Sequence, residues 1–561
     1  MDGLLLGAGE VIYDQPVSSR GPTRLTGRMP RSDGLRAAAR LFGVHDQAAA
    51  RGVSAEQVIG ERAEALTRRE VLAGGAALGA GALLGAPALS IARGLARTAP
   101  RIAVVGAGLA GLRCAHMLWT GHPGRPVAST VYDANPGRPG GRCWTLRGYF
   151  SGGLDTEHGG AFLNSNQSAI LRLASRLGLQ LELVDGGDLS SGEEVYLIDG
   201  APYTYAQASS DWESVGYRVF RRALRELGSA AGQSRLDSMS VPEWLESTPI
   251  GTGSRFGKLM LANAVTENGG DPQDMSALDL IEVTGRSRAV LNLPGDDERW
   301  HIQGGNDQLV TGMIGELPRG AVRLGHELLA LVAEPDGTST LVMDSGGTRI
   351  ETRADIVVLA LPFSTLRRVD LSRSGLSREK LNVIATMGMG SNAKIHLELA
   401  RKSWPALGYS GATYSNWDGF CCAWDDSVPL GAGGAPALFV GFPGGHVGAA
   451  GLTGQAHGPA PQADVSWLLK QIELVFPGTS ALYTGRAYED HWALDPWSLG
   501  AYSYMRVGQA ATYGAIAGAA EGAVMFAGEH TSVQNQGFLD GAVQSGERAA
   551  REVLGRLTRR R

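Results

Sequence analysis

Apolar runs that end in glycine turns mark the start of a regular fold after residue 100. Residues 101–105 (RIAVV) are predicted to form a strand, and LRCAHML after it continues with the apolar spacing of a helix. The run STVYDA predicts a second strand that ends near Asp133, and HELLALVAE (326–334) predicts another. Near the other end, VMFAG (524–528) predicts a short strand before a helix that starts at Gly537 or Phe538. This order of strands and helices predicts an α/β fold class.

A strict alternation covers SNAKIHLEL, residues 391–399. The isoleucine and two leucines at 395, 397 and 399 alternate as the buried face of a strand, so Lys394 shares the opposite face with His396 and Glu398. The whole chain has five lysines, and the other four lie in mixed or charged contexts. Two interpretations are open at this point: a solvated strand face, as is usual for charged residues, or a functional lysine.

An uncharged run of alanine, glycine and leucine extends from Val71 to Ala92, directly after Arg68, Arg69 and Glu70. The run is long enough to span a membrane but only weakly hydrophobic, so we interpret it as a signal. An arginine pair ahead of such a run resembles a twin-arginine export signal, within residues 67–99 after an extension of residues 1–66. Such a signal normally opens the chain, so either a later start such as Met29 is used or the run is an internal linker in a cytoplasmic protein.

Composition narrows the class of protein. A chain of 561 residues with 43% hydrophobic residues predicts a globular enzyme of two or three domains. Its formal net charge of -5 gives no electrostatic case for binding nucleic acid. The four cysteines show neither a CxxC pair nor a regular spacing, and no zinc or calcium motif occurs. We therefore expect buried free thiols and no metal.

The turn after the first strand carries the chemistry of a dinucleotide site. Gly106, Gly108 and Gly111 form GxGxxG between the strand and the helix. Glycines let the backbone approach a pyrophosphate, and the helix N-terminus offers it free N–H groups and a positive dipole end. Asp133 follows at the distance where a carboxylate takes the ribose hydroxyls. The alternative is an ordinary turn in a chain with 80 glycines.

Two longer motifs show which protein family this site resembles. PGGRCW follows Asp133 and leads to TEHGGAF at 156–162, and VMFAGEHTSVQNQGFLDGAVQSGERAA occupies 524–550. Together they resemble the flavin-containing amine oxidase family, which includes monoamine, polyamine and L-amino-acid oxidases. This chain departs in having Asp at the ribose position and a spacer to Gly140 that is about one residue longer than usual. The resemblance covers most of residues 100–561 and implies bound FAD.

The resemblance also implies how the chain divides. It predicts a discontinuous Rossmann-like FAD-binding domain from residues 100–167, 299–383 and 498–561. Residues 168–298 and 384–497 would form a mixed α+β substrate domain. The cofactor-binding residues that it implies are the three motif glycines with Asp133, Gly141, Arg142, Leu328, Gly528, Glu529 and Leu539. Of these, Arg142 would meet a phosphate.

The same resemblance implies which residues lie beside the flavin and the substrate amine. The family has a lysine that holds a water beside flavin N5, with a tryptophan a few residues on, and the matching positions are Lys394 and Trp404. Tyr502 and Phe538 match paired aromatics that flank the substrate amine. Some relatives join a cysteine to the flavin where this chain has Ala501, so we expect non-covalent FAD.

The implied reaction is oxidation of a primary or secondary amine to an imine, with dioxygen reduced to hydrogen peroxide. One alternative is an L-amino-acid oxidase or dehydrogenase. Several of those enzymes have an arginine where this chain has GGAFLNSN, but an arginine from residues 210–300 could replace it. Another is a desaturase or porphyrinogen-type oxidase that acts on C–C bonds, and a third is a flavoprotein without catalysis. The sequence leaves open which amine is used, the electron acceptor and whether the protein is a homodimer.

Overall fold

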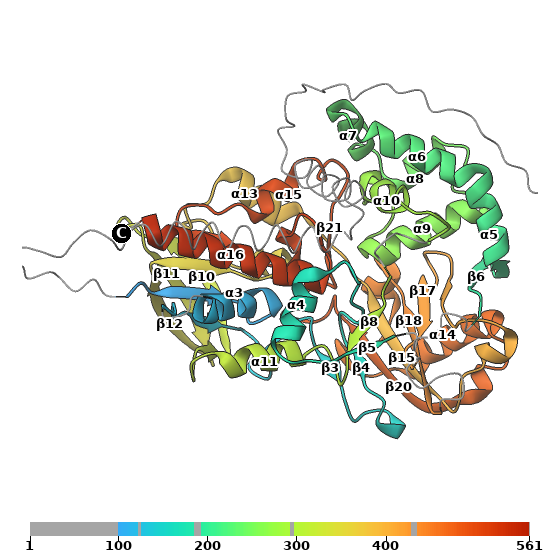
Figure 1. The fold of residues 1–561 in the computed structure, drawn as a ribbon, viewed down its shortest axis with the longest axis horizontal. Helices are drawn as coiled ribbons and strands as arrows, with labels where there is room; N and C mark the ends of the chain where they lie inside the picture. Colours follow the sequence, from blue (N-terminus) through green and yellow to red (C-terminus); the bar gives the residue numbers. More distant parts are fainter. Residues whose placement is uncertain (1–98, 122–124, 185–191, 292–296, 428–434, 560–561) are drawn as a thin grey trace, which may run out of the picture. The chain divides into compact units, whose positions relative to one another are not determined.

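The computed structural model describes residues 99–121, 125–184, 192–291, 297–427 and 435–559 (Figure 1). The predicted export signal and the extension before it lie outside these residues. Within them, no helix is both long and apolar enough to cross a membrane.

A five-stranded parallel sheet forms the first centre of the fold. Its strand order is β22-β13-β1-β2-β9, and every neighbouring pair is parallel. The strands are β1 (Ile102–Val105), β2 (Thr130–Tyr132), β9 (Val322–Arg323), β13 (Ile356–Leu359) and β22 (Val524–Phe526). Strands from distant parts of the sequence thus meet in one sheet, as the predicted Rossmann-like fold requires.

Two layers cover this sheet, one on each face. One face packs on the helices α3 (Leu109–Thr120), α4 (Ser168–Arg176), α11 (Gln308–Glu316) and α16 (Leu539–Arg559). The other packs on an antiparallel sheet and three short helices: β10 (His326–Ala333), β11 (Ser339–Ser345), β12 (Thr348–Ala354), α12 (Phe363–Leu366), α13 (Arg378–Thr386) and α15 (Tyr513–Gly518). Burial on both faces explains why β1, β13 and β22 are continuously apolar. Helix α4 belongs to this core although its residues fall in the segment predicted for the substrate domain.

A six-stranded antiparallel sheet forms the second centre. Its order is β16-β17-β18-β15-β20-β19. The strands are β15 (Ala393–Leu399), β16 (Thr413–Tyr414), β17 (Cys422–Asp425), β18 (Ala437–Phe442), β19 (His457–Pro459) and β20 (Tyr483–His491). Helix α14 (Gln462–Val475) packs on one face through an apolar core.

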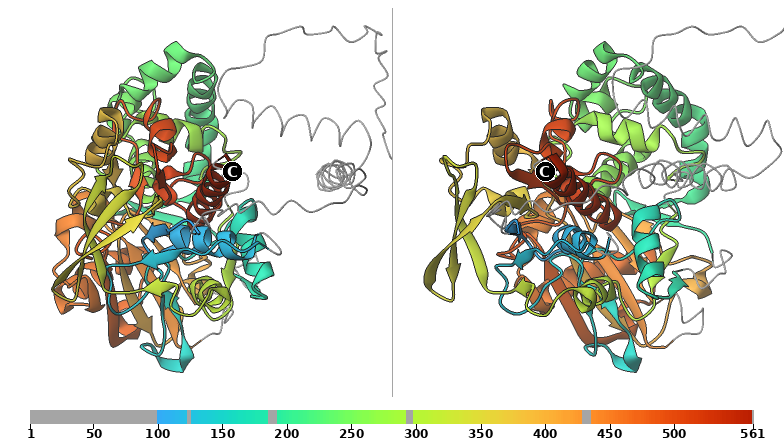
Figure 2. Two further views of the ribbon diagram at one scale, coloured as in Figure 1. Left: turned by 90° about the vertical axis from the view of Figure 1, so that its left-hand side faces the viewer. Right: turned by 60° about the vertical axis from the view of Figure 1, so that its left-hand side comes forward.

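Helices gather beside this second sheet, green above orange in both views of Figure 2. They are α5 (Tyr205–Asp211), α6 (Tyr217–Glu226), α7 (Ala230–Asp237), α8 (Val241–Glu246), α9 (Arg255–Asn268) and α10 (Ala277–Thr284). They share a core with the hairpin of β6 (Val195–Ile198) and β7 (Ala201–Thr204). Short strand pairs connect the parts: β3 (Thr145–Leu146) with β4 (Thr156–Glu157), β5 (Leu181–Leu183) with β8 (Trp300–Ile302), and β14 (Gly388–Met389) with β21 (Ser503–Tyr504).

Strand β15 is buried along its whole length, on both faces. Ile395, Leu397 and Leu399 enter the core with α14, as the alternation predicts. On the other face, His396 is 0% and Glu398 3% exposed. Residues 151–156 contact this face: the amide of Ser151 donates to Glu398, and the hydroxyl of Thr156 lies 3.2 Å from His396 Nδ1. The interpretation of a solvated strand face is therefore wrong.

Candidate active site

The turn between β1 and α3 leaves a cradle at its middle glycine. Gly106 has a positive φ of 107°, and a Cβ there would lie 2.6 Å from the carbonyl oxygen of Ala360. A Cβ on Gly111 would lie 2.0 Å from the carbonyl oxygen of Gly106. At Gly108 the nearest protein atom would be 3.9 Å away, and no side chain caps the helix there. Gly106 and Gly111 thus serve the protein's own packing, while Gly108 leaves open space at an uncapped helix N-terminus that fits a pyrophosphate.

Three of the other predicted cofactor residues line one cavity. Asp133, Gly141 and Leu328 share its wall. The Asp133 carboxylate accepts from the amide of Ala107 at 2.6 Å and from that of Asn135 at 2.9 Å. A fixed carboxylate next to the glycine turn fits the ribose of a dinucleotide.

Arg138 and Asp495 also line this cavity, and neither was predicted from the sequence. Arg138 donates to the carbonyl oxygen of Gly141 at 2.7 Å, and its guanidinium lies 3.9 Å from the ring centre of Trp144. Its place in PGRPGGR, four residues before Arg142, is a signal that could have identified it.

The two cofactor motifs meet at Arg142 and Glu529. Arg142 Nη1 lies 3.0 Å from Glu529 Oε1 and donates to the carbonyl oxygen of Ala501 at 2.6 Å. Glu529 also accepts from the hydroxyl of Ser503 at 2.7 Å and from the amide of Gly537 at 2.8 Å. Burial alone would raise the pKa of Glu529, but Arg142 and these donors hold it below its usual value. Arg142 thus connects three segments, and its contact with a phosphate stays a prediction.

Gly528 and Leu539 of the C-terminal motif, and Tyr502 before it, also have close neighbours. A Cβ on Gly528 would lie 2.2 Å from the ring of His530, and one on Gly160 would lie 2.7 Å from Leu539. Helix α16 begins at Leu539, directly after Phe538. The Tyr502 hydroxyl donates to the carbonyl oxygen of Thr266 on α9.

Lys394 lies at the junction of the two centres and is only 4% exposed. Its Nζ donates to the carbonyl oxygens of Glu157 at 2.8 Å and Gly159 at 2.7 Å, and lies 5.7 Å from the ring centre of Trp424. Burial lowers the pKa of Lys394, and the carboxylate of Asp426 opposes that change. Trp404 instead lies in the apolar core, with its indole N–H donating to Asp425.

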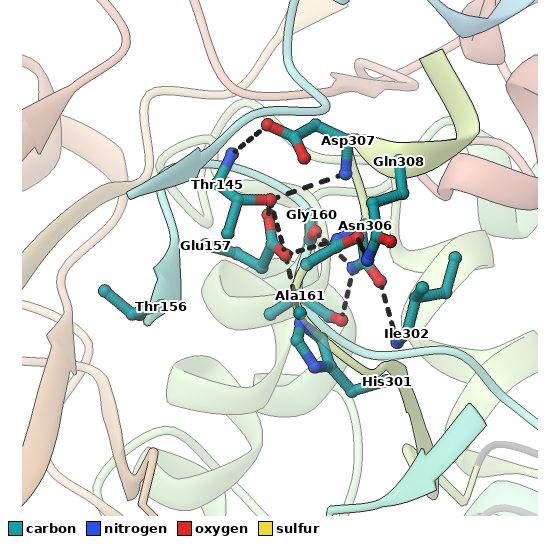
Figure 3. A network of polar contacts seen from close by, with 12 residues as sticks. Thr145, Thr156, Glu157, Gly160, Ala161, His301, Ile302, Asn306, Asp307 and Gln308 are labelled. Carbon is teal, nitrogen blue, oxygen red and sulfur yellow. Dashed lines mark hydrogen bonds and ion pairs between the residues drawn. The ribbon is translucent and has the colours of Figure 1, made fainter. Parts of the chain in front are cut away.

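A polar network holds the segment that receives Lys394 (Figure 3). The Glu157 carboxylate accepts from the Thr145 hydroxyl at 3.0 Å and the Asn306 amide at 2.7 Å, and lies 3.0 Å from His301 Nε2. The Asn306 side chain donates to the carbonyl oxygens of Gly160 and Ala161. Burial acts to lower the pKa of His301, but hydrogen bonds with Glu157 and Glu182 raise it to about 9. The network holds residues 157–161 in place through hydrogen bonds to both their side chains and their backbone. The sequence had not assigned a role to the side chains of Thr145, Glu157, His301 and Asn306.

A second buried network surrounds Asp490. Its Oδ1 lies 2.7 Å from Nδ1 of His158 and of His457, and its Oδ2 lies 3.1 Å from Nε2 of His396. Within the described residues, His158, His457 and Asp490 also have the spacing of metal ligands. We assign them as a hydrogen-bonded group because each contact has hydrogen-bond length and all three rings can donate to the carboxylate. The absence of a metal stays a prediction.

The four cysteines are free, and Cys114, Cys143 and Cys421 are buried. Burial raises the pKa of the Cys114 and Cys421 thiols to about 12 in both cases. Thiols with such a pKa are inert at neutral pH, as expected for small buried hydrophobic residues.

Comparison with known proteins agrees with the fold and its motifs. Among solved structures, the chain is similar to cyclohexylamine oxidase from Brevibacterium oxydans IH-35A, with a TM-score of 0.69 at 22% identity over 82% of this chain and 99% of that one. It is also similar to putrescine oxidase bound to putrescine, with a TM-score of 0.67 at 20% identity over 81% and 99% of the two chains. At these identities the likeness concerns the fold.

Proteins related to this chain in sequence are also amine oxidases. The chain is 26% identical over 480 residues to the flavin-containing amine oxidase A of Equus caballus, which covers 81% of this chain and 85% of the relative. It is 25% identical over 471 residues to polyamine oxidase 3 of Oryza sativa subsp. japonica, covering 82% and 90%. The family model for flavin containing amine oxidoreductase matches residues 109–554, which is most of the chain. The chain therefore belongs to the flavin-containing amine oxidoreductase family, whose members are enzymes acting on C–N bonds.

Proposed function

We propose that this protein is an FAD-dependent oxidase that converts a primary or secondary amine to an imine and passes the electrons to dioxygen, giving hydrogen peroxide. Bound FAD would supply the transfer of two electrons. The uncapped N-terminus of α3 and the space at Gly108 would hold its pyrophosphate, and Asp133 would hold a ribose.

The observation that supports an oxidase most is the position of Lys394. Two of its three N–H groups are used by the carbonyl oxygens of Glu157 and Gly159, which leaves one donor of a cation for a water or dioxygen. A fixed charge in a buried site loses little to solvent screening and needs no reorganisation during the reaction. Tyr502 and Phe538 would flank the amine and orient it.

Separate observations support an amine, and not an amino acid, as the substrate. Residues 159–166 contain no arginine that could hold a carboxylate, and Phe162 packs there against Trp424 with ring centres 5.5 Å apart. Of the arginines further on, Arg255 donates to the carbonyl oxygen of Pro202, and Arg235 pairs with Glu226.

Purified protein should release peroxide when it is given amines. A panel of primary amines, secondary amines and L-amino acids, assayed for peroxide and for bleaching of the flavin, tests the proposal directly. Bleaching with L-amino acids alone would overturn the amine assignment. Bleaching without peroxide would show a dehydrogenase.

The FAD is expected to be non-covalent because Ala501 cannot form a thioether. Acid denaturation should therefore release all the flavin into the supernatant, where its absorbance is measured after the precipitate is removed. Flavin that stays with the precipitate would contradict this prediction.

We also propose export by the twin-arginine route, on the sequence pattern of residues 67–92. Replacing Arg68 and Arg69 by lysine should keep the enzyme in the cytoplasm, because the arginine pair is read by a receptor and charge alone does not replace it. Cell fractionation measures the outcome, with replacement of Arg97 by lysine as the control. Equal export of both variants would rule out the signal.

A further inference from the structure

An acidic side chain enters the apolar core between the second sheet and α14. Glu489 lies on β20 opposite Ile395 of β15, and Ile395 belongs to that core. Opposite residues of paired strands project to the same face, so Glu489 points towards α14, and it is only 1% exposed. Among the described residues, no N–H or O–H group donates to either of its carboxyl oxygens in hydrogen-bond geometry. A buried carboxylate without a donor is costly, which favours the neutral acid.

A second carboxyl group, that of Asp464, lies next to Glu489. Asp464 is in the first turn of α14, is 4% exposed and shares a hydrogen bond with Glu489. Two carboxyl groups can share a hydrogen bond only when one of them carries a proton. Asp464 Oδ2 already accepts from the amide of Thr453 at 2.8 Å and from its hydroxyl at 2.9 Å. These donors and the positive end of the α14 dipole favour the ionised form of Asp464, so the proton belongs to Glu489.

Residues 452–457, which lead into β19, close over this pair. Thr453 donates to Asp464, and the next residue, Gly454, lies against Glu489: a Cβ on Gly454 would be 2.5 Å from Glu489 Oε1. Further along, the carbonyl oxygen of Ala456 accepts from the amide of His491 at 2.7 Å. The segment is thus held against α14 at Asp464 and against β20 at Glu489 and His491.

Few charged groups face Glu489. Asp464 faces it from α14, and Asp490 acts on it from its own strand. The buried ring of His491, two residues further along β20, has a pKa that burial lowers, so it adds no positive charge at neutral pH. The residues opposite Glu489 on β15 and β19 are an isoleucine and a glycine. No cation is therefore among the groups that act on this carboxyl group.

The surroundings favour one shared proton over two negative charges. Burial and the charge of Asp464 raise the pKa of Glu489 to about 8, and the nearby amide of Gly454 opposes this change without completing a hydrogen bond. A bound metal ion would need further ligands. Among the described residues, no third histidine, cysteine or carboxylate completes a metal site with this pair. At pH 7 the pair therefore holds one proton and one negative charge.

We propose that Glu489 and Asp464 share one proton and form a pH-sensitive latch, which holds residues 452–457 closed on β20 and α14 and opens when the proton is lost. The segment ends at His457, whose ring nitrogens lie 2.7 Å from Asp490 Oδ1 and 2.9 Å from Asp495 Oδ2. Asp495 lines the cavity where we place FAD. The latch therefore links pH to how firmly the protein holds its cofactor. This consequence, but not the latch itself, rests on the proposed function.

The direction of the pH effect follows from the number of bound protons. When the latch opens, Glu489 meets water and its pKa returns to about 4.3. Between that pH and about 8, the closed form binds more protons than the open form. The closed form is therefore most favoured in acid, and it loses up to about tenfold in population relative to the open form per pH unit as pH rises from about 5 to about 8. Above that range Glu489 is ionised in both forms, so the ratio levels off.

Glu489→Gln should keep the latch closed at every pH, because its amide donates to Asp464 as the protonated acid does. Hydrogen exchange of the amides of residues 452–457 in the full chain, expressed as protection at each pH, measures the opening. In wild type this protection should fall at least about tenfold between pH 6 and pH 8. In Glu489→Gln it should stay within about twofold over the same range. The matched control is Glu473→Gln on the same helix, which should keep the pH dependence of wild type.

Infrared spectroscopy observes the shared proton itself. The difference spectrum between wild type and Glu489→Gln should show the C=O stretch of a protonated carboxyl group at pH 6, and this band should disappear by pH 9. Asp464→Asn can keep the two contacts with Thr453 while its amide donates to an ionised Glu489. In that variant the band and the loss of protection should therefore move to lower pH by at least about one unit.

Equal pH dependence of protection in wild type and Glu489→Gln would overturn the latch, and so would the absence of the carboxyl band. If Glu489→Gln does not fold, Asp464→Asn decides the matter, and an unchanged pH range in that variant would overturn the proposal.

Release of FAD, followed by the fluorescence of free flavin, should become several-fold faster from pH 6 to pH 8 in wild type but not in Glu489→Gln. An equal rise in both proteins would overturn the link to the cofactor cavity. None of these measurements uses amine or dioxygen. A wild-type enzyme that oxidises no amine therefore counts against the proposed function and leaves the test of the latch intact.

Discussion

Lys394→Met is expected to leave FAD bound and to slow reoxidation of the reduced flavin by dioxygen on the order of a hundredfold. The methionine fills a similar volume but removes a charge held by the carbonyl oxygens of Glu157 and Gly159. Leaving those two carbonyls without a donor should also lower the free energy of unfolding by about 1 to 3 kcal/mol. The flavin's colour follows both halves separately, first with amine under anaerobic conditions and then after oxygen is added.

A matched control is needed because burial alone does not distinguish Lys394. Lys380 is 0% and Lys402 8% exposed, so three of the five lysines are buried. Lys380 Nζ donates to the carbonyl oxygens of Ala517 and Ala519 and lies 3.9 Å from the ring centre of Phe526. Lys380→Met should therefore destabilise the protein in the same way and leave the oxygen reaction unchanged. Equal reoxidation rates in Lys394→Met, Lys380→Met and wild type would contradict the role of Lys394.

The first cofactor motif could be predicted from sequence because its pattern is local. The strand, the glycine turn and the helix follow one another within residues 101–121, and β1 and α3 appear where the apolar spacing places them. The same holds for β10 and for the start of α16, which begins one residue after Phe538. Over such short segments the period of apolar residues and the turn residues determine the structure.

The surroundings of Lys394 could not be predicted because they come from distant segments. The cover of β15 is supplied by residues 151–159. The donors to Glu157 come from Thr145, Asn306 and His301. In the sequence, Lys394, His396 and Glu398 read as a polar strand face. Whether water or protein meets such a face depends on tertiary contacts that alternation does not encode. The histidines around Asp490, from positions 158, 396 and 457, were unassigned for the same reason.

Gly108→Ala is expected to weaken FAD binding by at least about tenfold, which is about 1.4 kcal/mol, without unfolding the protein. A Cβ at this position meets no protein atom closer than 3.9 Å, and the backbone φ of −73° suits alanine. The free energy of unfolding without cofactor should therefore change by less than about 1 kcal/mol. The methyl group would instead occupy the space at the helix N-terminus where we place the pyrophosphate. Titration of the cofactor-free protein with FAD gives the affinity, and thermal unfolding gives the stability.

Gly111→Ala is the matched comparison. It should also lose FAD, but because the fold itself is destabilised. Its Cβ would lie 2.0 Å from the carbonyl oxygen of Gly106 and 3.2 Å from the side chain of Ala360. Because both neighbours belong to the packed junction of β1, β13 and α3, overpacking there should cost about 3 kcal/mol or more even without cofactor. FAD should then be lost together with the fold. If Gly108→Ala destabilised the cofactor-free protein as much as Gly111→Ala, the middle glycine would serve protein packing and the cradle would lose its support as a phosphate site.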